Sequence, residues 1–196
     1  MISTNDKKIY DYCKKYINHG TGKQKKYSNK FLYNKNLFGT NLRITEIQSV
    51  AGLEQLKELK KIQKKREEIS KDYFKLISKY HNFIDCYMPP KNIKNAWYRF
   101  YFFLKPNIKN YNKIRYKIIK SLNKGNLKCF TGACPEIYLE KAFKNLKNFK
   151  VTRLKNCKIL GESSIALDVN HTLNDKDYKQ NLIIIESVLK KNLKNK

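Results

Sequence analysis

Residues 39–48 read Gly39-Thr40-Asn41-Leu42-Arg43-Ile44-Thr45-Glu46-Ile47-Gln48 and lead into a long charged segment that ends near Tyr80. Glycine and asparagine at the start favour a turn. Thr45 and Gln48 stand three residues apart, which is the spacing of a capping box at the start of a helix. Apolar residues then recur at spacings of three and four, at Ile47, Val50, Ala51, Leu53, Leu56, Leu59, Ile62, Ile69, Tyr73 and Leu76. The pattern predicts one long amphipathic helix.

The sequence after this segment changes character at Pro89-Pro90, where we predict a boundary because proline interrupts regular structure. The patterns downstream predict strands at 96–104, 127–130 and 163–169, and helices at 111–122, 135–143 and 175–191, the last one capped by Asn174. This order of β-α-β-α-β-α predicts a compact α+β unit.

The residues before Gly39 predict less regular structure. Residues 1–5 are strand-like, and residues 6–17 have helical spacing with Asn5 or Asp6 as the cap. Asn18-His19-Gly20 is typical of a helix end, and the polar, lysine-rich residues 21–36 predict a loop.

The composition indicates a folded protein of 196 residues, since 41% of them are hydrophobic and 14 Tyr and 10 Phe are available for a core. No apolar run is long enough to span a bilayer, and polar residues follow Met1, so we expect a cytoplasmic protein without a membrane partner. The five cysteines lack a Cys-x-x-Cys pair and the three histidines are scattered. These spacings predict reduced thiols and no metal site.

The formal net charge of +27 raises the possibility of a nucleic-acid partner. Only five of the 43 basic residues are arginine, the residue best suited to paired contacts with bases and phosphates. The lysines are spread along the whole chain, and Lys, Asn, Ile and Tyr all have A/T-rich codons. Base composition alone therefore accounts for the charge, and we rank nucleic-acid binding as the third hypothesis.

No glycine-rich nucleotide loop and no Ser/His/Asp set is present in the sequence. Cys134 precedes Pro135 at an expected helix start, where its pKa would be lowered, and the alternative is a packed thiol in a turn. His19 either contacts a ligand or ends a helix. The residues alone therefore indicate an α+β protein and leave these two roles open.

The opening segment, followed by Gly52-Leu53-Glu54-Gln55-Leu56, resembles the DegT/DnrJ/StrS family of sugar aminotransferases. That family typically has Gly-x-Asn-x-Arg-Met-Thr/Ser-Glu-Ile-Gln and then Gly-Leu-x-Gln-Leu, so Ile44 replaces a methionine. Further similar segments follow the family's order at residues 2–6, 18–20, 97–100, 129–143, 160–164 and 172–175. Asp168 and His171 depart from the family, which tends to have an apolar residue and a proline at these positions.

The resemblance implies the C-terminal portion of a pyridoxal phosphate (PLP)-dependent, type I aminotransferase fold. Residues 1–90 would be a remnant of the large α/β domain with a long interdomain helix, and residues 91–196 the small α+β domain. In the family a Schiff-base lysine, within Ser-x-x-x-x-Lys, lies shortly upstream of the segment that begins here at Ser3. We therefore assign no catalytic residue to this chain.

The resemblance also implies one cofactor-binding residue. In the family the loop asparagine, here Asn41, reaches across a dimer interface to the PLP phosphate of the partner subunit. The alternative is that Asn41 only shapes the turn before the helix.

The first hypothesis for function is thus a partial nucleotide-sugar aminotransferase of amino-sugar and polysaccharide biosynthesis, inactive alone. Its family moves an amino group, typically from glutamate, to a keto group on a nucleotide-linked sugar. Its expected partner is a separately encoded N-terminal half or a second copy in a homodimer. The second hypothesis is a non-catalytic, truncated remnant that binds a partner.

Overall fold

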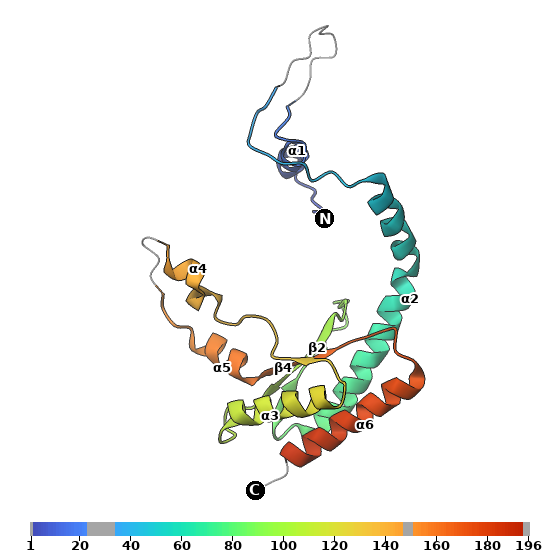
Figure 1. The fold of residues 1–196 in the computed structure, drawn as a ribbon, viewed down its shortest axis with the longest axis vertical. Coiled ribbons are helices and arrows are strands. Elements are labelled where there is room, and N and C mark those ends of the chain that lie inside the picture. Colours follow the sequence, from blue (N-terminus) through green and yellow to red (C-terminus); the bar gives the residue numbers. More distant parts are fainter. Residues whose placement is uncertain (1, 23–33, 147–150, 194–196) are drawn as a thin grey trace. The chain divides into compact units, whose positions relative to one another are not determined.

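The computed structural model describes residues 2–22, 34–146 and 151–193 (Figure 1). The chain divides into two compact units, residues 1–58 and residues 59–196, and the division falls within one long helix.

The first unit contains α1 (Lys7–Tyr16) and the beginning of α2 (Glu46–Ile77). Asp6 caps α1, as its carboxylate accepts hydrogen bonds from the backbone N–H groups of Lys8 and Ile9. The prediction of a strand near the N-terminus is wrong, because the described residues 2–5 form no strand. Instead, the Thr4 hydroxyl accepts from the backbone of Asp6 and leads the chain into the helix.

The start of α2 confirms the capping box. The side-chain oxygen of Gln48 accepts from the Thr45 backbone N–H at 3.0 Å, and the Thr45 hydroxyl accepts from the Gln48 N–H at 3.3 Å. These bonds satisfy two backbone donors that the helix itself leaves free. Lys57 and Glu54 pair on the helix surface at 2.6 Å. The sequence therefore predicts the start of this helix to the residue.

The apolar residues of α2 differ in burial between its two ends. Near the C-terminal end, Ile69 and Tyr73 are buried in the core of the second unit. In the first unit, the side chains along the helix are exposed by 59–83%, namely Ile47, Val50, Leu53 and Leu56. Exposed apolar groups of this size at successive turns favour association with another surface.

We therefore expect the purified chain to self-associate through the first turns of α2. Replacing Ile47, Leu53 and Leu56 together with serine should weaken self-association at least about tenfold, because it removes contiguous apolar area. Analytical ultracentrifugation over a range of concentrations measures the effect. Ile183→Ser is the matched control, since Ile183 is comparably exposed on another helix. A wild-type chain that remains monomeric at high concentration would contradict the prediction.

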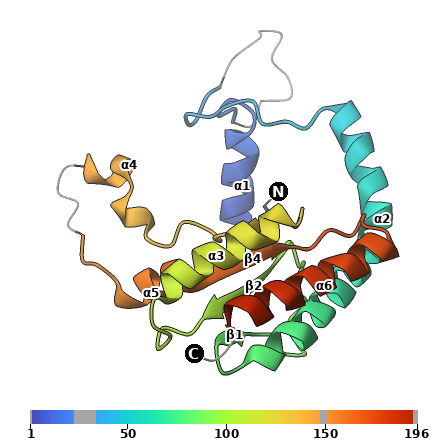
Figure 2. The same ribbon diagram turned by 60° about the horizontal axis from the view of Figure 1, so that its bottom comes forward.

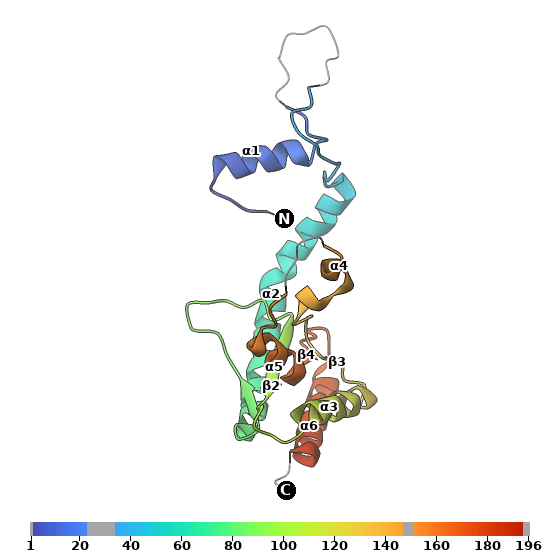
Figure 3. The same ribbon diagram turned by 90° about the vertical axis from the view of Figure 1, so that its left-hand side faces the viewer.

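The second unit is built on a four-stranded sheet with the order β1-β2-β4-β3. Strands β2, β4 and β3 are labelled in Figure 3. Its strands are β1 (Ile84–Cys86), β2 (Arg99–Leu104), β3 (Cys129–Phe130) and β4 (Ser164–Asp168), and every neighbouring pair is antiparallel. In the register, Leu167 of β4 lies opposite Phe100 of β2 on one side and opposite Cys129 of β3 on the other. The three downstream strands confirm the sequence prediction, whereas β1 was not predicted.

Besides the C-terminal part of α2, this unit contains the helices α3 (Tyr111–Lys124), α4 (Lys141–Lys144), α5 (Lys155–Ser163) and α6 (Asp175–Asn192). Short 3₁₀ turns lie at Ser78–Tyr80 and Ile137–Leu139. Helices α3 and α6 lie side by side against the sheet (Figure 2). The Asn174 side chain caps α6 by accepting from the Asp177 N–H at 2.8 Å. The predicted helix at 135–143 is wrong, because a 3₁₀ turn ends at Leu139 and α4 begins only at Lys141. Helix α5 was not predicted.

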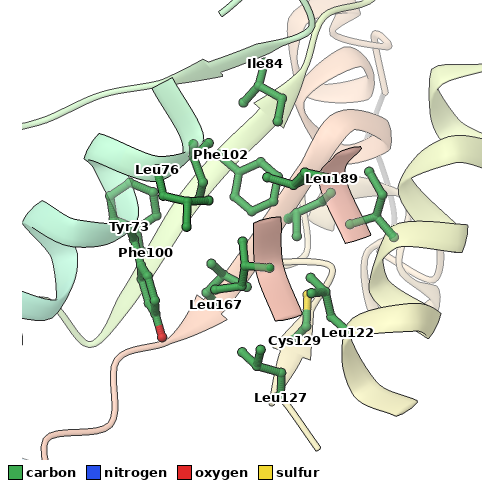
Figure 4. Packing of buried hydrophobic residues seen from close by; sticks show 14 of the residues in the cluster. Tyr73, Leu76, Ile84, Phe100, Phe102, Leu122, Leu127, Cys129, Leu167 and Leu189 are labelled. Carbon is green, nitrogen blue, oxygen red and sulfur yellow. The ribbon is translucent and has the colours of Figure 1, made fainter. Parts of the chain in front are cut away.

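The core lies between one face of the sheet and the helices α2, α3 and α6 (Figure 4). Phe100 and Phe102 of β2 are fully buried there, as are Leu122 of α3 and Leu189 of α6. The ring of Tyr73 meets that of Phe100 edge to face at 5.9 Å. Burial raises the pKa of Tyr73, whose hydroxyl donates to the backbone carbonyl of Asp168.

The strand β1 precedes Pro89, so the sheet begins before the position at which the sequence suggested a boundary. The assignment of residues 1–90 and 91–196 to the family's large and small domains stays a prediction. None of the helices within the described ranges combines the length and the apolarity needed to cross a membrane.

Candidate functional site

Two loop segments of the first unit run side by side and carry two of the motifs that the sequence singled out. The first follows α1 and includes Asn18-His19-Gly20, and the second includes Thr40 and Asn41. Thr40 donates its N–H to the Tyr16 carbonyl at 3.0 Å and its carbonyl accepts from the His19 N–H at 3.2 Å. The two segments are distant in the sequence, so only the fold brings these motifs together.

Two glycines allow this close approach. Gly20 has φ of +71°, and a Cβ atom built there would lie 1.7 Å from the Leu37 carbonyl oxygen. A Cβ atom on Gly39 would lie 2.5 Å from both the Gly20 nitrogen and the Tyr16 oxygen. A side chain at either position would therefore separate the segments. The sequence placed Gly39 in a turn and Gly20 at a helix end but did not indicate that the two glycines meet.

Asn41 uses its side-chain oxygen within its own turn. The Oδ1 atom accepts from the backbone N–H and from the Nε–H of Arg43, both at 3.3 Å. A side-chain oxygen bonded to the backbone two residues ahead is an Asx turn, so the turn-shaping role is present. Because both donors require an oxygen, they also fix which end of the amide is the oxygen and which is the NH₂.

The amide NH₂ group of Asn41 has no partner among the described residues, and the side chain is exposed. The residue can therefore hold the turn with its oxygen and still donate hydrogen bonds to a ligand with its nitrogen. The two alternatives for Asn41 thus involve different atoms and are compatible. Arg43 holds the loop through its two hydrogen bonds to the Asn41 side chain.

His19 lies in the turn that ends α1. It has φ of +55°, its side chain is exposed, and its backbone N–H is bonded to Thr40. Of the two alternatives for His19, ligand contact and helix end, these features correspond to the helix end. The loop expected at 21–36 falls mostly outside the described residues, but its ends are described. There Gly22 donates to the Asn34 carbonyl at 2.8 Å.

Cys134 does not have the lowered pKa that its position before Pro135 suggested. Partial desolvation, a hydrogen bond from its thiol to Glu140 at 3.5 Å and the negative charge of Glu140 raise the pKa of Cys134. The lowered-pKa alternative is wrong because no helix begins at Pro135, so no helix dipole stabilises a thiolate. The thiol is exposed, so it is not closely packed in the turn either.

The remaining candidate side chains do not form a second cluster. Across the described ranges, no group of three or more His, Cys, Asp or Glu residues could hold a metal ion. Asp168 ends β4, directly opposite Arg99 in the register. The Nδ1 atom of His171 is buried and lacks a hydrogen-bond partner in the described part of the chain. All five cysteines are free thiols.

The sequence profile of the DegT/DnrJ/EryC1/StrS aminotransferase family matches residues 1–187. The chain belongs to this family. The resemblance carried by the segments around Asn41 and Gly52 is thereby confirmed over almost the entire sequence.

Solved structures of aminotransferases share the fold. The aminotransferase from Psychrobacter cryohalolentis is 27% identical, with a TM-score of 0.83 over 98% of this chain and 51% of that one. The pseudoaminic acid biosynthesis aminotransferase PseC of Helicobacter pylori is 22% identical, with a TM-score of 0.79 over 96% and 48%. A putative sugar aminotransferase from Streptococcus pneumoniae in its PLP form is 19% identical, with a TM-score of 0.76 over 97% and 46%.

A curated relative is also matched over about half of its length. An uncharacterised protein of Methanocaldococcus jannaschii is 25% identical over 98% of this chain and 50% of its own length. The chain thus spans about half the length of the relatives that it matches. The expected fold, a portion of a PLP-dependent aminotransferase, is confirmed.

The family's cofactor, PLP, carries a phosphate group, and the chemistry of Asn41 fits it. A phosphate accepts hydrogen bonds, and the uncommitted NH₂ of Asn41 donates them. The exposed loop supplies this donor on a backbone that the paired segments hold in place.

Proposed function

We propose that this family member is the C-terminal half of a PLP-dependent nucleotide-sugar aminotransferase. The observation that carries the proposal is the Asn41 loop, held against the end of α1 with its amide donor uncommitted. The family match over residues 1–187 and the half-length coverage of the aminotransferase structures support it.

The proposed role of Asn41 is to donate a hydrogen bond to the phosphate of PLP in a partner subunit. An amide N–H bonded to an anionic oxygen is stronger than a bond between neutral groups. The Asx turn with Arg43 orients the donor before the cofactor arrives, so little ordering is needed on binding. PLP, when bound, supplies the electron sink for moving an amino group between two carbon atoms.

The proposed reaction transfers an amino group, typically from glutamate, to a keto group on a nucleotide-linked sugar. The lysine that the chemistry requires would come from a separately encoded N-terminal half, because we assign no lysine of this chain to it. The chain would contribute the small domain, the Asn41 loop and part of the interface with that partner. We place the protein in the cytoplasm, which agrees with its five free thiols.

The first test is the behaviour of the chain alone. We expect the purified chain to show no absorbance band of protein-bound PLP and no cofactor attached after borohydride reduction, since only a single phosphate donor is assigned to it. Absorbance spectra with added PLP, followed by mass spectrometry of the reduced protein, measure this. Stoichiometric PLP on one specific lysine of this chain would contradict the split-enzyme proposal.

A second candidate is a non-catalytic protein that binds a partner. The exposed apolar residues at the start of α2 favour it, because such a surface serves association without any chemistry. The reading frame upstream of the gene separates the two candidates. An intact frame that encodes Ser-x-x-x-x-Lys supports the split enzyme, and a disrupted frame supports the non-catalytic protein.

A further inference from the structure

Arg99 begins β2 on the face of the sheet that lies opposite the core. Successive side chains of a strand point to opposite faces. Phe100 and Phe102 are buried among the helices, so Arg99 and Tyr101 face the other way. A half-buried, charged guanidinium needs neighbouring groups that compensate for its lost contact with water.

Two aromatic rings hold the guanidinium group of Arg99. Its central carbon lies 4.0 Å from the ring centroid of Phe130 and 5.2 Å from that of Tyr98. Arginine stacks on aromatic rings through its flat face, and both distances are within the range of a cation–π contact. The side chains of Phe130 and Tyr98 are 37% and 68% exposed, so the cluster is open to solvent.

The N–H groups of Arg99 remain uncommitted. Stacking uses the face of the guanidinium plane, whereas its hydrogen-bond donors lie in the plane. Three other arginines, Arg43, Arg115 and Arg153, each donate to an oxygen of the chain. In the described part of the chain, the guanidinium of Arg99 has no hydrogen bond or ion pair, and the rings are its partners.

Asp168 lies directly opposite Arg99 in the register, but the two side chains do not form an ion pair among the described residues. The guanidinium of Arg99 therefore keeps its hydrogen-bond donors free of this carboxylate in the described part of the chain. The backbone carbonyl of Asp168 accepts from Tyr73, which anchors the strand end to α2 instead. The positive charge of Arg99 is therefore available to a ligand.

We propose that Arg99, held by Tyr98 and Phe130, is a binding site for the oxyanion of a small molecule, either a carboxylate or a phosphate. Paired in-plane N–H donors match two oxygens of either group. The stacked rings orient the donors in advance, which lowers the cost of ordering a long side chain. This site lies in the second unit and uses none of the residues assigned to PLP, so it does not depend on the proposed function.

The test uses the full chain, with inorganic phosphate and succinate as separate probes at constant ionic strength. Side-chain NMR of the five arginine Nε–H groups locates the site, and Arg99→Lys identifies the Arg99 resonance by removing it. We expect one probe to shift the Arg99 resonance saturably and more than the other four. The probe that does so distinguishes a phosphate site from a carboxylate site.

Calorimetric affinities of variants separate this site from general attraction to a protein of net charge +27. Arg99→Gln should weaken binding about tenfold or more, the usual effect of losing a charged hydrogen bond. Arg99→Lys should weaken it about threefold or more, because lysine keeps the charge but lacks the planar pair of donors. Lys117→Gln is the matched control, which removes one charge from an exposed position on α3 and should change affinity less than about twofold.

Two results would overturn the proposal. One is the absence of saturable binding for both probes, and the other is an equal loss of affinity in Arg99→Gln and Lys117→Gln, which indicates adventitious attraction only. Circular dichroism checks that each variant is folded. If Arg99→Gln fails to fold, Arg99→Lys and Phe130→Leu decide the matter, because Phe130→Leu removes a ring contact and keeps the charge. Unchanged affinity in both of these variants would equally overturn the proposal.

Discussion

Asn41→Ala is expected to weaken PLP binding by roughly 10- to 150-fold when this chain is combined with a lysine-bearing N-terminal half. The substitution removes one hydrogen bond to a charged phosphate, which contributes about 1.5–3 kcal/mol. It also removes the Asx turn with Arg43, which costs about 1 kcal/mol locally. The loss should therefore fall on cofactor retention more than on folding. PLP titration of the reconstituted pair measures cofactor affinity, and the melting temperature measures the effect on folding.

Asn41→Asp separates the two roles of this side chain. A carboxylate oxygen still accepts from both donors of Arg43, so the turn is kept, but it cannot donate to a phosphate and it repels one. We expect this variant to match the wild-type melting temperature and to bind PLP at least as weakly as Asn41→Ala. Wild-type PLP affinity in both variants would mean that Asn41 serves only the turn. The proposed hydrogen bond from Asn41 to the PLP phosphate of a partner subunit would then be wrong.

Phe100→Ala is expected to lower the free energy of unfolding of the second unit by about 3–5 kcal/mol, the usual range for a buried phenylalanine. The side chain is fully buried, meets Tyr73 edge to face at 5.9 Å and stacks on Trp97 at 6.0 Å. The truncation therefore leaves a cavity and also removes two aromatic contacts. Urea unfolding followed by circular dichroism measures the change.

Phe100→Leu should be tolerated much better, at a cost below about 2 kcal/mol, because it keeps most of the buried volume. Tyr116→Ala is the surface control, since Tyr116 is largely exposed on α3, and it should change stability by less than about 0.5 kcal/mol. If Phe100→Ala and Tyr116→Ala had similar effects, the position of Phe100 at the centre of this core would be in doubt.

The sequence predicted the elements whose signals are local. The capping box of Thr45 and Gln48 and the cap at Asn174 each depend on residues only a few positions apart. The aromatic run of β2 predicted the strand itself, whereas its alternating burial differs from the expected cover on both faces. The edge strand β1 was missed because it is only three residues long, and so was α5, which lacks a side-chain cap at Leu154. Short segments of this kind are determined by what they pack against.

The candidate site was predictable in part. The resemblance identified Asn41, but the pairing of its loop with the end of α1 depends on the contact between Gly20 and Gly39. Nothing in the spacing of two distant glycines indicates that their backbones meet. The stacking of Arg99 on Phe130 was hidden for the same reason, since β4 lies between their strands. The lowered-pKa alternative for Cys134 is wrong because it assumed a helix start at Pro135 that the chain does not form.

The strand order has a consequence for synthesis of the chain on the ribosome. β4 is the last strand to be made, yet it lies between β2 and β3 and is the partner of both. Until Asp168 has left the exit tunnel, β3 has no neighbour and β2 has only the three-residue β1. Contacts that join distant parts of a chain form slowly, and unpaired strand edges meanwhile invite aggregation. We therefore expect the second unit to fold after translation has passed β4, with chaperones covering the nascent β2 until then.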